Sequence, residues 1–550
     1  MKIVIIGGVA GGASAAARLR RLDEKAEITV IERTGYVSYA NCGLPYYVSG
    51  VIEERSELML QTPNGFRTRF NIDVRVKHEA VSIDTEEKTV TVKRLRDGSE
   101  YLLPYDRLIL APGAKPVIPA VPGTDSSRIY TVRTVEDVMR LKETVSLPDT
   151  KRAVVSGGGF IGLEMAENLV EAGVETTVVQ RPNHLLKTLD RDMASILHDH
   201  VRRKGVILEL GCEAVGYETG GHITTVLKDG RRLESDIVVL ALGVEPDTSL
   251  AKAAGLKTGI KGSIIVDEHM ETSIEGVYAV GDAVQVKNYV TGKDDLISLA
   301  GPANRQGRIA ADNICGIKST YKGSQGSSVV KVFDLTVATT GVNEKAAEAA
   351  GMAFDKVFVY APSNATYYPG ARYMTLKVLF NPGDGRILGA QIIGSKGVDK
   401  RIDVLATAIR AGMTSDDLEE LDLAYAPPFS SAKDPVNIAG YVIGNVRRGL
   451  FRHFYCEDVK SLPKDGSVIL LDVRSSEEFR EGHISGAVNI PVDNLRGRLD
   501  ELDRSKEVYA YCHNGQRSYV ACRILSQEGH SCYNLAGGFR LYRFTNAEDE

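Results

Sequence analysis

The sequence KIVIIGGVAGG at positions 2–12 decides the fold of this chain. Lys2–Ile6 is short and β-branched, as a buried parallel strand requires, and glycines follow it directly. A helix rich in Ala and Arg is then predicted up to Leu22, and a second strand, Ile28–Ile31, ends in Glu32. This order of strand, glycine-rich turn, helix and strand is typical of a dinucleotide-binding domain.

The same order returns later in the chain. A strand is predicted at Ala153–Val155, a turn at GGGFIG (positions 157–162), a helix at Leu163–Glu171 and a second strand at Thr176–Val179. The sequence therefore predicts two dinucleotide sites in one chain.

Glycines at such a turn permit a tight bend and bring the backbone close to a pyrophosphate, which rests on the N-terminus of the next helix. In the first copy Val9 replaces the usual second glycine, but Glu32 stands 20 residues after Gly12, where a carboxylate binds ribose hydroxyls. A glycine-rich turn beside a surface glutamate is the alternative, and it does not explain why all these features align. The residues expected at the first dinucleotide are Gly7, Gly8, Val9, Ala10, Gly11, Gly12 and Glu32.

The second copy keeps all three glycines of the pattern. The residues expected at its dinucleotide are Gly157, Gly159, Phe160, Ile161, Gly162 and Gln180. Gln180 and Arg181 stand where NAD sites carry Asp or Glu. A glutamine hydrogen-bonds a 2′-hydroxyl and an arginine suits a 2′-phosphate, so the choice between NADH and NADPH stays open.

Composition excludes several classes of protein. At 550 residues the chain exceeds one ordinary core, and 25% charged with 43% hydrophobic residues is typical of a globular protein rather than a disordered or membrane-spanning one. The net charge of −5 gives no footprint for nucleic acid, and no apolar run is long enough to span a bilayer. Seven scattered cysteines do not form a disulfide framework, which favours a reducing cytoplasm.

Two further regions follow the dinucleotide sites. The first, about 327–446, contains the β-branched stretch Val329–Thr340 and a predicted helix at Lys400–Ala411, but no phosphate loop. The second starts near Cys456 and has the pattern of a separate α/β domain of about 95 residues. Its predicted strands and helices are Ser467–Val473, Glu477–Arg480, Val508–Tyr511 and Ser518–Glu528.

Over about residues 1–445 the chain resembles the two-dinucleotide flavoprotein disulfide reductases. YDRLILAPGA at positions 105–114 is similar to the segment that links their FAD and NAD portions, and VYAVGDA at 277–283 to the segment whose Asp binds the FAD ribityl chain. The resemblance implies FAD at the first site, NADH or NADPH at the second, and a third region that dimerises the protein. It adds Ala111, Gly113, Gly243, Gly281 and Asp282 to the cofactor-binding residues.

A single cysteine lies in the stretch SYANCGLPYY, positions 38–47. Cys42 has no partner at C-x-x-C or C-x₄-C spacing, so a dithiol pair is absent. A lone thiolate beside a flavin forms either a mixed disulfide with an external thiol or a sulfenic acid after peroxide attack. An inert buried cysteine is the structural alternative, and the flavoprotein context argues against it.

This stretch is similar to the coenzyme A disulfide and persulfide reductase branch. The resemblance implies that Ser38, Asn41 and Cys42 meet the substrate thiol and that Arg18 and Arg21 lie near its ADP portion. Solvated arginines beside Arg20 are the alternative for the last two. Phe70 departs from the pattern, because a close relative has a basic contact there; that role then falls to Arg67 or Arg69, or is lost.

Three residues of the third region match the same branch. They are Tyr367 in NATYYPG, Tyr425 in AYAPP and Lys433 in SSAKDP. The resemblance implies that both tyrosines reach Cys42 of the other subunit of a homodimer, where a phenol can protonate a departing thiolate, and that Lys433 contacts coenzyme A.

The terminal region contains CHNGQR, positions 512–517, between a predicted strand and helix. Backbone N–H groups and a helix N-terminus stabilise a thiolate at such a place. The C-x₄-R loop, LDVR at 471–474 and GHISGAVNIP at 482–491 resemble the rhodaneses over 456–550, whereas phosphatase loops are one residue longer. The resemblance implies that Cys512 carries sulfur and Arg517 holds the loop and an anionic donor. We expect Asp472 and Arg474 to be structural, and Cys522 and Cys532 to be packing residues.

The predicted fold class is α/β: two Rossmann-like dinucleotide-binding domains, an α+β dimerisation domain and a C-terminal α/β rhodanese domain. The expected bounds are 1–115 with 244–326 for FAD, 116–243 for NAD(P), 327–446 for dimerisation and 456–550 for the rhodanese domain.

The predicted function is NAD(P)H-dependent reduction of a coenzyme A persulfide or disulfide, or of polysulfide, by a cytoplasmic homodimer. FAD, NADH or NADPH, and coenzyme A are the expected cofactors, with no metal, nucleic acid or membrane partner. Two alternatives stay open: an NADH oxidase or peroxidase with a Cys42 sulfenate, and a protein that is chiefly a sulfurtransferase.

Overall fold

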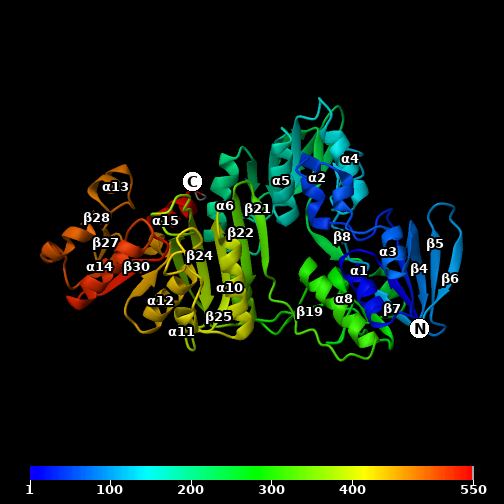
Figure 1. The fold of residues 1–550 in the computed structure, drawn as a ribbon. Coiled ribbons are helices and arrows are strands. Elements are labelled where there is room, and N and C mark those ends of the chain that lie inside the picture. The colour runs from blue at the N-terminus through cyan, green and yellow to red at the C-terminus, as the bar shows by residue number, and fades with distance from the viewer. Residues whose placement is uncertain (548–550) are drawn as a thin grey trace. The chain divides into compact units, whose positions relative to one another are not determined.

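The computed structural model describes residues 1–547 and divides into two compact units, shown in Figure 1. The first unit comprises Met1–Asn183 and Gly205–Gly326, and the second comprises His184–Lys204 and Ser327–Glu550. Among residues 1–547, no helix combines the length and the apolar composition needed to cross a membrane.

The first dinucleotide domain is built on a five-stranded parallel sheet in the order β18-β7-β1-β2-β3. Its strands are β1 (Lys2–Ile6), β2 (Glu27–Glu32), β3 (Asp73–Val76), β7 (Arg107–Leu110) and β18 (Val277–Ala279). Helices α1 (Ala10–Leu22) and α8 (Ala300–Ile314) pack against each other beside it. Gly307 makes this packing close, because a Cβ there would lie 2.3 Å from the carbonyl oxygen of Gly11.

The second dinucleotide domain repeats the plan with the strand order β12-β11-β10-β16-β9. Its strands are β9 (Ile129–Tyr130), β10 (Arg152–Ser156), β11 (Glu175–Gln180), β12 (Ile207–Leu210) and β16 (Ile237–Leu240). Helix α5 (Phe160–Glu171) follows β10, as the glycine-rich turn predicts.

Shorter elements complete the first unit. Two antiparallel sheets consist of β4 (His78–Asp84), β5 (Thr89–Arg94) and β6 (Glu100–Pro104), and of β13 (Ala214–Thr219), β14 (Ile223–Leu227) and β15 (Arg232–Ser235). Two-stranded pairs are β8 (Ala114–Pro116) with β17 (Val244–Pro246) and β19 (Val286–Lys287) with β20 (Asp294–Asp295). The helices are α2 (Leu44–Ser49), α3 (Pro63–Phe70), α4 (Val135–Val145) and α7 (Ser249–Ala253).

The second unit contains an antiparallel sheet in the order β21-β22-β25-β24-β23. Its strands are β21 (Ser328–Val332), β22 (Leu335–Gly341), β23 (Asp355–Pro362), β24 (Tyr373–Phe380) and β25 (Ile387–Gly394). The stretch Val329–Thr340, whose β-branched alternation predicts sheet, forms a hairpin of this sheet that turns at Phe333, whose φ is 56°. The helices are α6 (Arg191–Arg203), α9 (Glu344–Ala350), α10 (Val398–Ala411), α11 (Ser415–Glu420) and α12 (Pro435–Arg447).

The terminal domain has a parallel sheet in the order β26-β30-β29-β27-β28. Its strands are β26 (Arg452–Phe454), β27 (Val468–Asp472), β28 (Val488–Asn489), β29 (Glu507–Tyr511) and β30 (Cys532–Leu535). The helices are α13 (Ser476–Glu481), α14 (Gln516–Gln527) and α15 (Gly538–Asn546). The predicted fold class is confirmed, including the α/β pattern of this last region.

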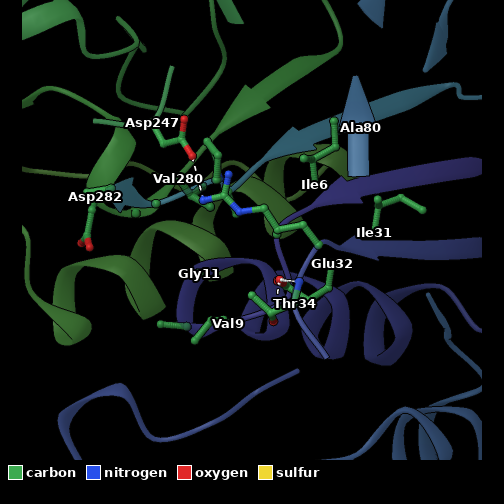
Figure 2. A pocket seen from close by; sticks show the side chains of 18 of the residues that line it. Ile6, Val9, Gly11, Ile31, Glu32, Thr34, Ala80, Asp247, Val280 and Asp282 are labelled. Atoms are coloured by element: carbon green, nitrogen blue, oxygen red, sulfur yellow. Dashed lines mark hydrogen bonds and ion pairs between the residues drawn. The ribbon is translucent and has the colours of Figure 1, made fainter. Parts of the chain in front are cut away.

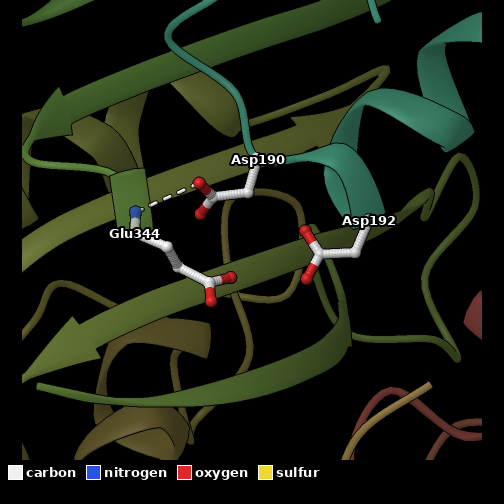
Figure 3. Close-up of side chains that lie close together, drawn as sticks. All are labelled: Asp190, Asp192 and Glu344. Atoms are coloured by element: carbon white, nitrogen blue, oxygen red, sulfur yellow. Dashed lines mark hydrogen bonds between the residues drawn. The ribbon is translucent and has the colours of Figure 1, made fainter. Parts of the chain in front are cut away.

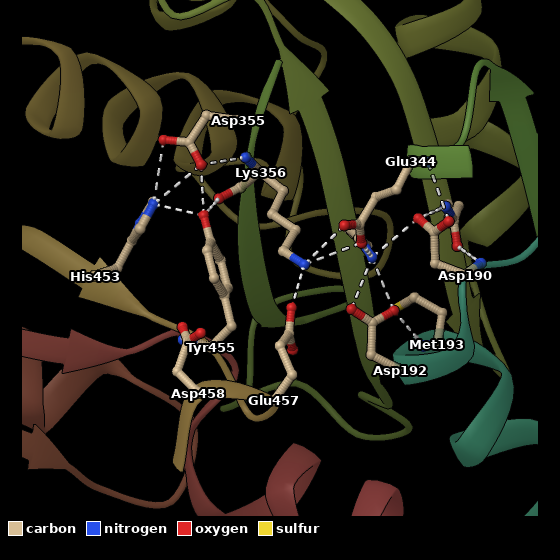
Figure 4. A network of polar contacts seen from close by, with 12 residues as sticks. Asp190, Asp192, Met193, Glu344, Asp355, Lys356, His453, Tyr455, Glu457 and Asp458 are labelled. Carbon is tan, nitrogen blue, oxygen red and sulfur yellow. Dashed lines mark hydrogen bonds and ion pairs between the residues drawn. The ribbon is translucent and has the colours of Figure 1, made fainter. Parts of the chain in front are cut away.

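A buried charge network ties α6, the β23/β24 part of the sheet and the terminal domain together within the second unit (Figure 4). The carboxylates of Asp190, Asp192 and Glu344 converge (Figure 3), and the Lys377 ammonium lies 2.9 Å from Asp190 and 2.7 Å from Asp192 and also contacts Glu344. Burial acts to lower the pKa of Lys377, but the carboxylates outweigh it and raise the pKa. The three carboxylates therefore surround the Lys377 ammonium as their common partner.

The network continues into the terminal domain through a second lysine. The Lys356 ammonium bonds Glu344 at 2.9 Å and Glu457 at 2.7 Å. Nearby, the Tyr455 hydroxyl donates to Asp355 at 2.5 Å. These contacts attach β26 and the residues after it to β23.

Candidate active site

Close backbone contacts shape the first glycine-rich turn. A Cβ on Gly7 would lie 2.0 Å from the carbonyl oxygen of Ala111, and one on Gly12 would lie 1.9 Å from that of Gly7. The cleft above the turn is lined by Gly7, Val9, Ala10 and Gly11, whereas Gly8 and Gly12 serve the packing beneath it. Gly7 and Gly12 therefore have to be glycines, because any side chain would collide with the backbone of Ala111 or of the turn itself.

Glu32 closes one side of this cleft (Figure 2). One carboxylate oxygen accepts the Gly8 N–H at 2.9 Å, and the other accepts the Thr34 N–H at 2.8 Å and its hydroxyl at 2.9 Å. These bonds hold an acidic group at the end of β2, at the place where a ribose would lie.

At the other side of the cleft lies Asp282, in the short helical turn Gly281–Ala283. Burial raises the pKa of its carboxyl, and the Arg133 guanidinium, 3.6 Å away, acts against this rise. Ala111, Gly113 and Gly281 line the same cleft, and the Gly281 N–H donates to Gln306 at 2.7 Å. Asn41 also lines this cleft. Its Oδ1 atom is buried and has no hydrogen-bond partner within residues 1–547, so it is available to a polar group of a ligand.

The second glycine-rich turn repeats the first with one change of charge. A Cβ on Gly157 would lie 2.2 Å from the Ala241 carbonyl oxygen and one on Gly162 1.8 Å from that of Gly157, while Gly159 faces open space. The Gly158 N–H donates to Gln180 at 2.8 Å, as Gly8 donates to Glu32. A neutral amide thus takes the place of the carboxylate.

The neighbours of this turn add two details. Phe160 and Ile161 start α5, and Gly243 follows β16 with a φ of 103°. Arg181 is exposed, with Glu213 at 3.6 Å.

Cys42 lies in the 3-10 turn Asn41–Gly43, directly before α2. The turn is fixed from both sides, because the Gly43 N–H donates to the Ala40 carbonyl at 2.9 Å and the Ser38 N–H donates to the Gly8 carbonyl at 2.8 Å. Ser38 has a φ of 47°, an unusual conformation for a serine, and such strain clusters at functional sites. The cysteine loop is therefore bonded directly to the first dinucleotide turn.

The surroundings of Cys42 disfavour its thiolate. Cys42 is exposed on the single chain and only partly surrounded by protein. Burial raises the pKa of the Cys42 thiol, the carboxylates of Glu164 and Asp282 raise it further, and Arg133 acts against them. Burial also raises the pKa of the Glu164 carboxyl to about 7, and the Tyr46 hydroxyl lies 3.5 Å from it. Sequence reasoning missed Glu164, which comes from α5 of the second dinucleotide domain.

A second cleft lies along α1 and α8 in the first unit and contains three predicted residues, Arg18, Arg21 and Ser38. It is also lined by residues that the sequence analysis missed: Gln61, Asn304 and Arg308. Phe70 lines it, whereas Arg67 and Arg69 do not, so the extra cation comes from Arg308 on α8. No motif marks that residue, because it reaches the cleft only through the packing of α8 on α1.

The three arginines of α1 have different environments. Arg20 is buried, and its guanidinium donates to backbone carbonyls, among them those of Phe70 at 2.7 Å and Ala26 at 2.7 Å. Arg18 bonds Asp312 at 2.7 Å. Arg21 is exposed at the cleft, so it is the best placed of the three for an external phosphate.

The predicted tyrosines meet in the second unit. The hydroxyls of Tyr367 and Tyr425 lie 2.8 Å apart, and both side chains are exposed on the single chain, Tyr367 by 75%. Phe429, four residues after Tyr425, is 73% exposed. Lys433 is exposed next to the buried pair Asp434 and Arg401. An exposed group of aromatic side chains is typical of a surface that another chain covers.

Cys512 lies at the end of β29, inside the loop that leads to α14. Cys512 is fully buried, and its sulfur accepts hydrogen bonds from the Gly515 N–H at 3.2 Å and from the Ser518 hydroxyl at 3.3 Å. The loop is fixed from outside as well, since the Phe539 N–H donates to the Cys512 carbonyl at 2.8 Å. These donors form the anion-stabilising arrangement that the sequence predicts for a thiolate.

Neighbouring residues of the terminal domain are structural. Arg474 bonds Asp472 at 2.6 Å and the Gly482 carbonyl at 2.7 Å, with both side chains buried. Cys522 and Cys532 pack in the domain core, where the Cys532 thiol donates to the Cys522 carbonyl at 3.2 Å. Arg517, which the resemblance assigns to holding the loop and an anionic donor, forms a two-bond pair with Glu478 at 2.6 and 2.7 Å.

Comparison with known protein families matches three segments of the chain. Residues 1–307 match the model of the pyridine nucleotide-disulphide oxidoreductases, residues 327–435 that of their dimerisation domain, and residues 456–543 that of rhodanese-like domains. The chain belongs to the pyridine nucleotide-disulphide oxidoreductase family. It is therefore an oxidoreductase with an FAD site and an NAD(H) site, as the resemblance implies.

Individual relatives share most or all of this plan. The crystal structure of reduced Bacillus anthracis CoADR-RHD is 47% identical, with a TM-score of 0.97 over 100% of this chain and 98% of that one. The structure of a NAD-dependent persulfide reductase from A. fulgidus is 40% identical, with a TM-score of 0.93 over 98% and 100%. The coenzyme A disulfide reductase of Staphylococcus haemolyticus is 34% identical over 80% of this chain and 98% of its own length.

The first cleft and the second glycine-rich turn fit the cofactors of this family. FAD, when bound, transfers electrons between a nicotinamide and a thiol, and the polar cleft with Glu32 and Asp282 would hold it beside the Cys42 loop. The turn at Gly157–Gly162 would hold the nicotinamide dinucleotide. The chain itself then supplies the thiol, its orientation and the acidic and basic groups around it.

Proposed function

We propose that this chain is an NAD(P)H-dependent reductase of coenzyme A persulfides and disulfides that uses Cys42 as its single redox thiol. The observation that carries the proposal is Ser38, which lies four residues before Cys42 and also lines the arginine-bearing cleft along α1 and α8. A substrate with a phosphate at one end and a thiol at the other fits this arrangement, because its phosphates meet Arg21 and its sulfur meets Cys42. The names of the B. anthracis, A. fulgidus and S. haemolyticus relatives support the same substrate class.

The proposed chemistry needs one thiolate and two electrons. The Cys42 thiolate attacks the coenzyme A sulfur of the persulfide, a Cys42–coenzyme A disulfide forms, and hydrosulfide leaves. Two electrons from NAD(P)H then break the mixed disulfide and release coenzyme A; FAD, held at the cleft with Glu32 and Asp282, would supply this electron transfer. The net change is one persulfide and one NAD(P)H converted with a proton to a thiol, hydrogen sulfide and NAD(P)⁺.

We further propose that the working form is a homodimer in which Tyr367 and Tyr425 complete the partner's Cys42 site and Lys433 meets coenzyme A. Their exposure on the single chain supports this role. The paired hydroxyls can donate a proton to the thiolate that leaves Cys42. The division into domains at 1–115 with 244–326, 116–243, 327–446 and 456–550 belongs to the same proposal.

The terminal domain is proposed to carry sulfur on Cys512 and to exchange it with the same pool of persulfides. Its bonded sulfur and the rhodanese-like match support this role. Reduction of a disulfide alone would leave Cys512 without a use.

Steady-state NADH and NADPH oxidation tests the proposal, with coenzyme A persulfide, coenzyme A disulfide, polysulfide and oxygen compared side by side. The expected result is fast turnover with coenzyme A persulfide and slow turnover with oxygen. Oxygen or peroxide turnover without coenzyme A, together with a sulfenate on Cys42, would instead identify an oxidase or peroxidase. Sulfur transfer that proceeds equally fast with and without NADH, in a protein that reduces none of these substrates, would identify a sulfurtransferase.

A further inference from the structure

The cation beside the sulfur-carrying cysteine is already neutralised. Both terminal nitrogens of Arg517 bond Glu478, at 2.6 and 2.7 Å, so each carboxylate oxygen has one guanidinium partner. The pKa of the Arg517 guanidinium is raised first by Glu478 and to a smaller extent by Cys512, which lies five residues before it in the same loop. The face that an anion would use on this arginine is thus occupied by the chain's own carboxylate.

Glu478 is held in this position by its own helix. It is the third residue of α13 and accepts the Ser475 N–H at 3.0 Å, while the Ser475 hydroxyl accepts the Glu478 N–H at 3.2 Å. The hydrogen bonds from Arg517 lower the pKa of Glu478 to about 2, although partial burial acts against them. The carboxylate is therefore charged at neutral pH.

The other charged groups near the loop do not supply a free cation. Arg474 is paired with the buried Asp472. Arg540 donates to the Thr375 hydroxyl at 3.0 Å and lies over the Tyr360 ring at 4.5 Å, so its guanidinium faces the β23/β24 sheet rather than the sulfur. Burial lowers the pKa of His513, and Arg540 lowers it further, so its ring does not provide a charge at neutral pH.

We infer that Cys512 takes sulfur from persulfides or similar donors of low charge, and that Glu478 excludes dianionic donors such as thiosulfate. The inference rests on the proposed role of Cys512 as a sulfur carrier. A dianion that approaches the sulfur meets an Arg517–Glu478 pair with no net charge, in which the carboxylate occupies the guanidinium, instead of an open guanidinium. A persulfide needs no such cation, since its reactive end carries at most one charge.

The transfer step is balanced for either kind of donor. With a persulfide, the Cys512 thiolate attacks the outer sulfur, a Cys512 persulfide forms and a thiol leaves. With thiosulfate the same attack forms the same persulfide and releases sulfite. Cyanide then removes the sulfur as thiocyanate and restores the thiolate, which gives one readout for both donors.

Glu478→Gln in the full-length, FAD-loaded protein tests the inference. Glutamine keeps the helix cap, because a capping box accepts Gln at this position, but it removes the charge that neutralises Arg517. Thiocyanate formation is measured with thiosulfate and with the persulfide of 2-mercaptoethanol. We expect kcat/KM for thiosulfate to rise about tenfold or more in the variant, while the persulfide value changes by less than about threefold.

Glu477→Gln is the matched control. Glu477 lies on the same helix and pairs with Arg480 at 3.1 Å, and both side chains are 72% exposed. Its loss removes the same charge one residue away without freeing Arg517. We expect both donors to react with this variant as with the unchanged protein.

Several outcomes distinguish a failure of the inference about Glu478 from a failure of the proposed carrier role of Cys512. Equal use of thiosulfate by the unchanged and Glu478→Gln proteins, or an equal gain in Glu477→Gln, would overturn the inference. Thiosulfate also serves as a competitor against the persulfide in the unchanged protein, so the inference is testable even when the variant does not fold: strong inhibition contradicts it and weak inhibition supports it. If neither donor adds the mass of one sulfur atom to Cys512, the proposed carrier role itself fails.

Discussion

Cys42 and Cys512 are two single thiols in contrasting environments within one chain. Cys42 is exposed on the single chain, and burial of its sulfur and two nearby carboxylates raise the pKa of its thiol. Cys512 is fully buried, and its sulfur accepts an N–H and a hydroxyl from its own loop. The first site therefore depends on groups from outside its loop, whereas the second holds its sulfur with local donors.

The largest effect should come from replacing each thiol in turn. Cys42→Ser should reduce NADH-dependent reduction of coenzyme A persulfide by at least about a thousandfold, because the stretch at positions 38–47 contains no second cysteine to form the mixed disulfide. Cys512→Ser should leave that reaction largely intact and slow turnover with polysulfide or a protein persulfide, where sulfur must first be captured. NADH oxidation with each substrate measures both effects.

This comparison has a clear way to fail. If Cys512→Ser loses about tenfold with every substrate, at unchanged FAD content, Cys512 lies in the main reduction path and the two thiols do not divide the work. Intact mass provides a second check: coenzyme A should be found as a mixed disulfide on Cys42 of protein purified without reductant, and it should be absent from the Cys42→Ser protein.

Subunit exchange tests whether the Cys42 site is completed from outside the subunit. Cys42→Ser and Tyr425→Phe proteins are each expected to be strongly impaired, because one lacks the thiol and the other the proton donor. Mixed dimers contain one site with both groups intact, so up to about a quarter of the normal activity should return after exchange. Activity that stays at the level of the two parents would show that the tyrosines act elsewhere.

The arginine cleft should give a smaller effect confined to substrate binding. Arg21→Ala and Arg308→Ala should each raise KM for coenzyme A persulfide about tenfold with little change in kcat, because an arginine–phosphate contact contributes about 1.5–3 kcal/mol. Arg67→Ala is the control, since Arg67 lies outside the cleft. A larger effect from Arg67 than from Arg308 would mean that the phosphates lie along α3 instead.

The two thiol sites also differ in how far sequence reveals them. The loop of Cys512 and the first glycine-rich turn were predictable because both are local: Gly12 must approach the Gly7 carbonyl five residues before it, and Gly515 has a φ of 95°. The strand Lys2–Ile6 and the helix end at Leu22 were predicted to the residue for the same reason.

The residues that sequence reasoning missed arrive through tertiary packing. Arg308 enters the cleft because α8 packs on α1, and Glu478 meets Arg517 across 39 residues of chain. Lys377 is fully buried in the middle of a strand and is tolerated only because Asp190 and Asp192, far away in sequence, surround it. Charge pairing of this kind leaves no periodic or spaced signal.

The smallest predicted effect concerns the carboxylate nearest to Cys42. The pKa of Glu164 is about 7, so the side chain is mostly neutral below that pH and mostly charged above it. Its charge raises the pKa of the Cys42 thiol, and Glu164→Gln should therefore lower the pH midpoint of Cys42 alkylation by about half a unit. The rate of iodoacetamide labelling of the FAD-loaded, reduced protein measures this midpoint.

The size of the effect depends on pH, which makes the test sharper. Above pH 7 the Glu164→Gln protein should react faster than the unchanged protein. The difference should shrink as the pH falls through about 7, because Glu164 is then protonated and no longer repels the Cys42 thiolate. Glu175→Gln, at the exposed start of β11, removes a charge elsewhere on the same domain and should leave the midpoint unchanged. Alkylation of Cys512 should be insensitive to either substitution, because its sulfur is held by the Gly515 N–H and the Ser518 hydroxyl; a shift at Cys512 would show that the two thiols respond to a common field and not to their separate surroundings.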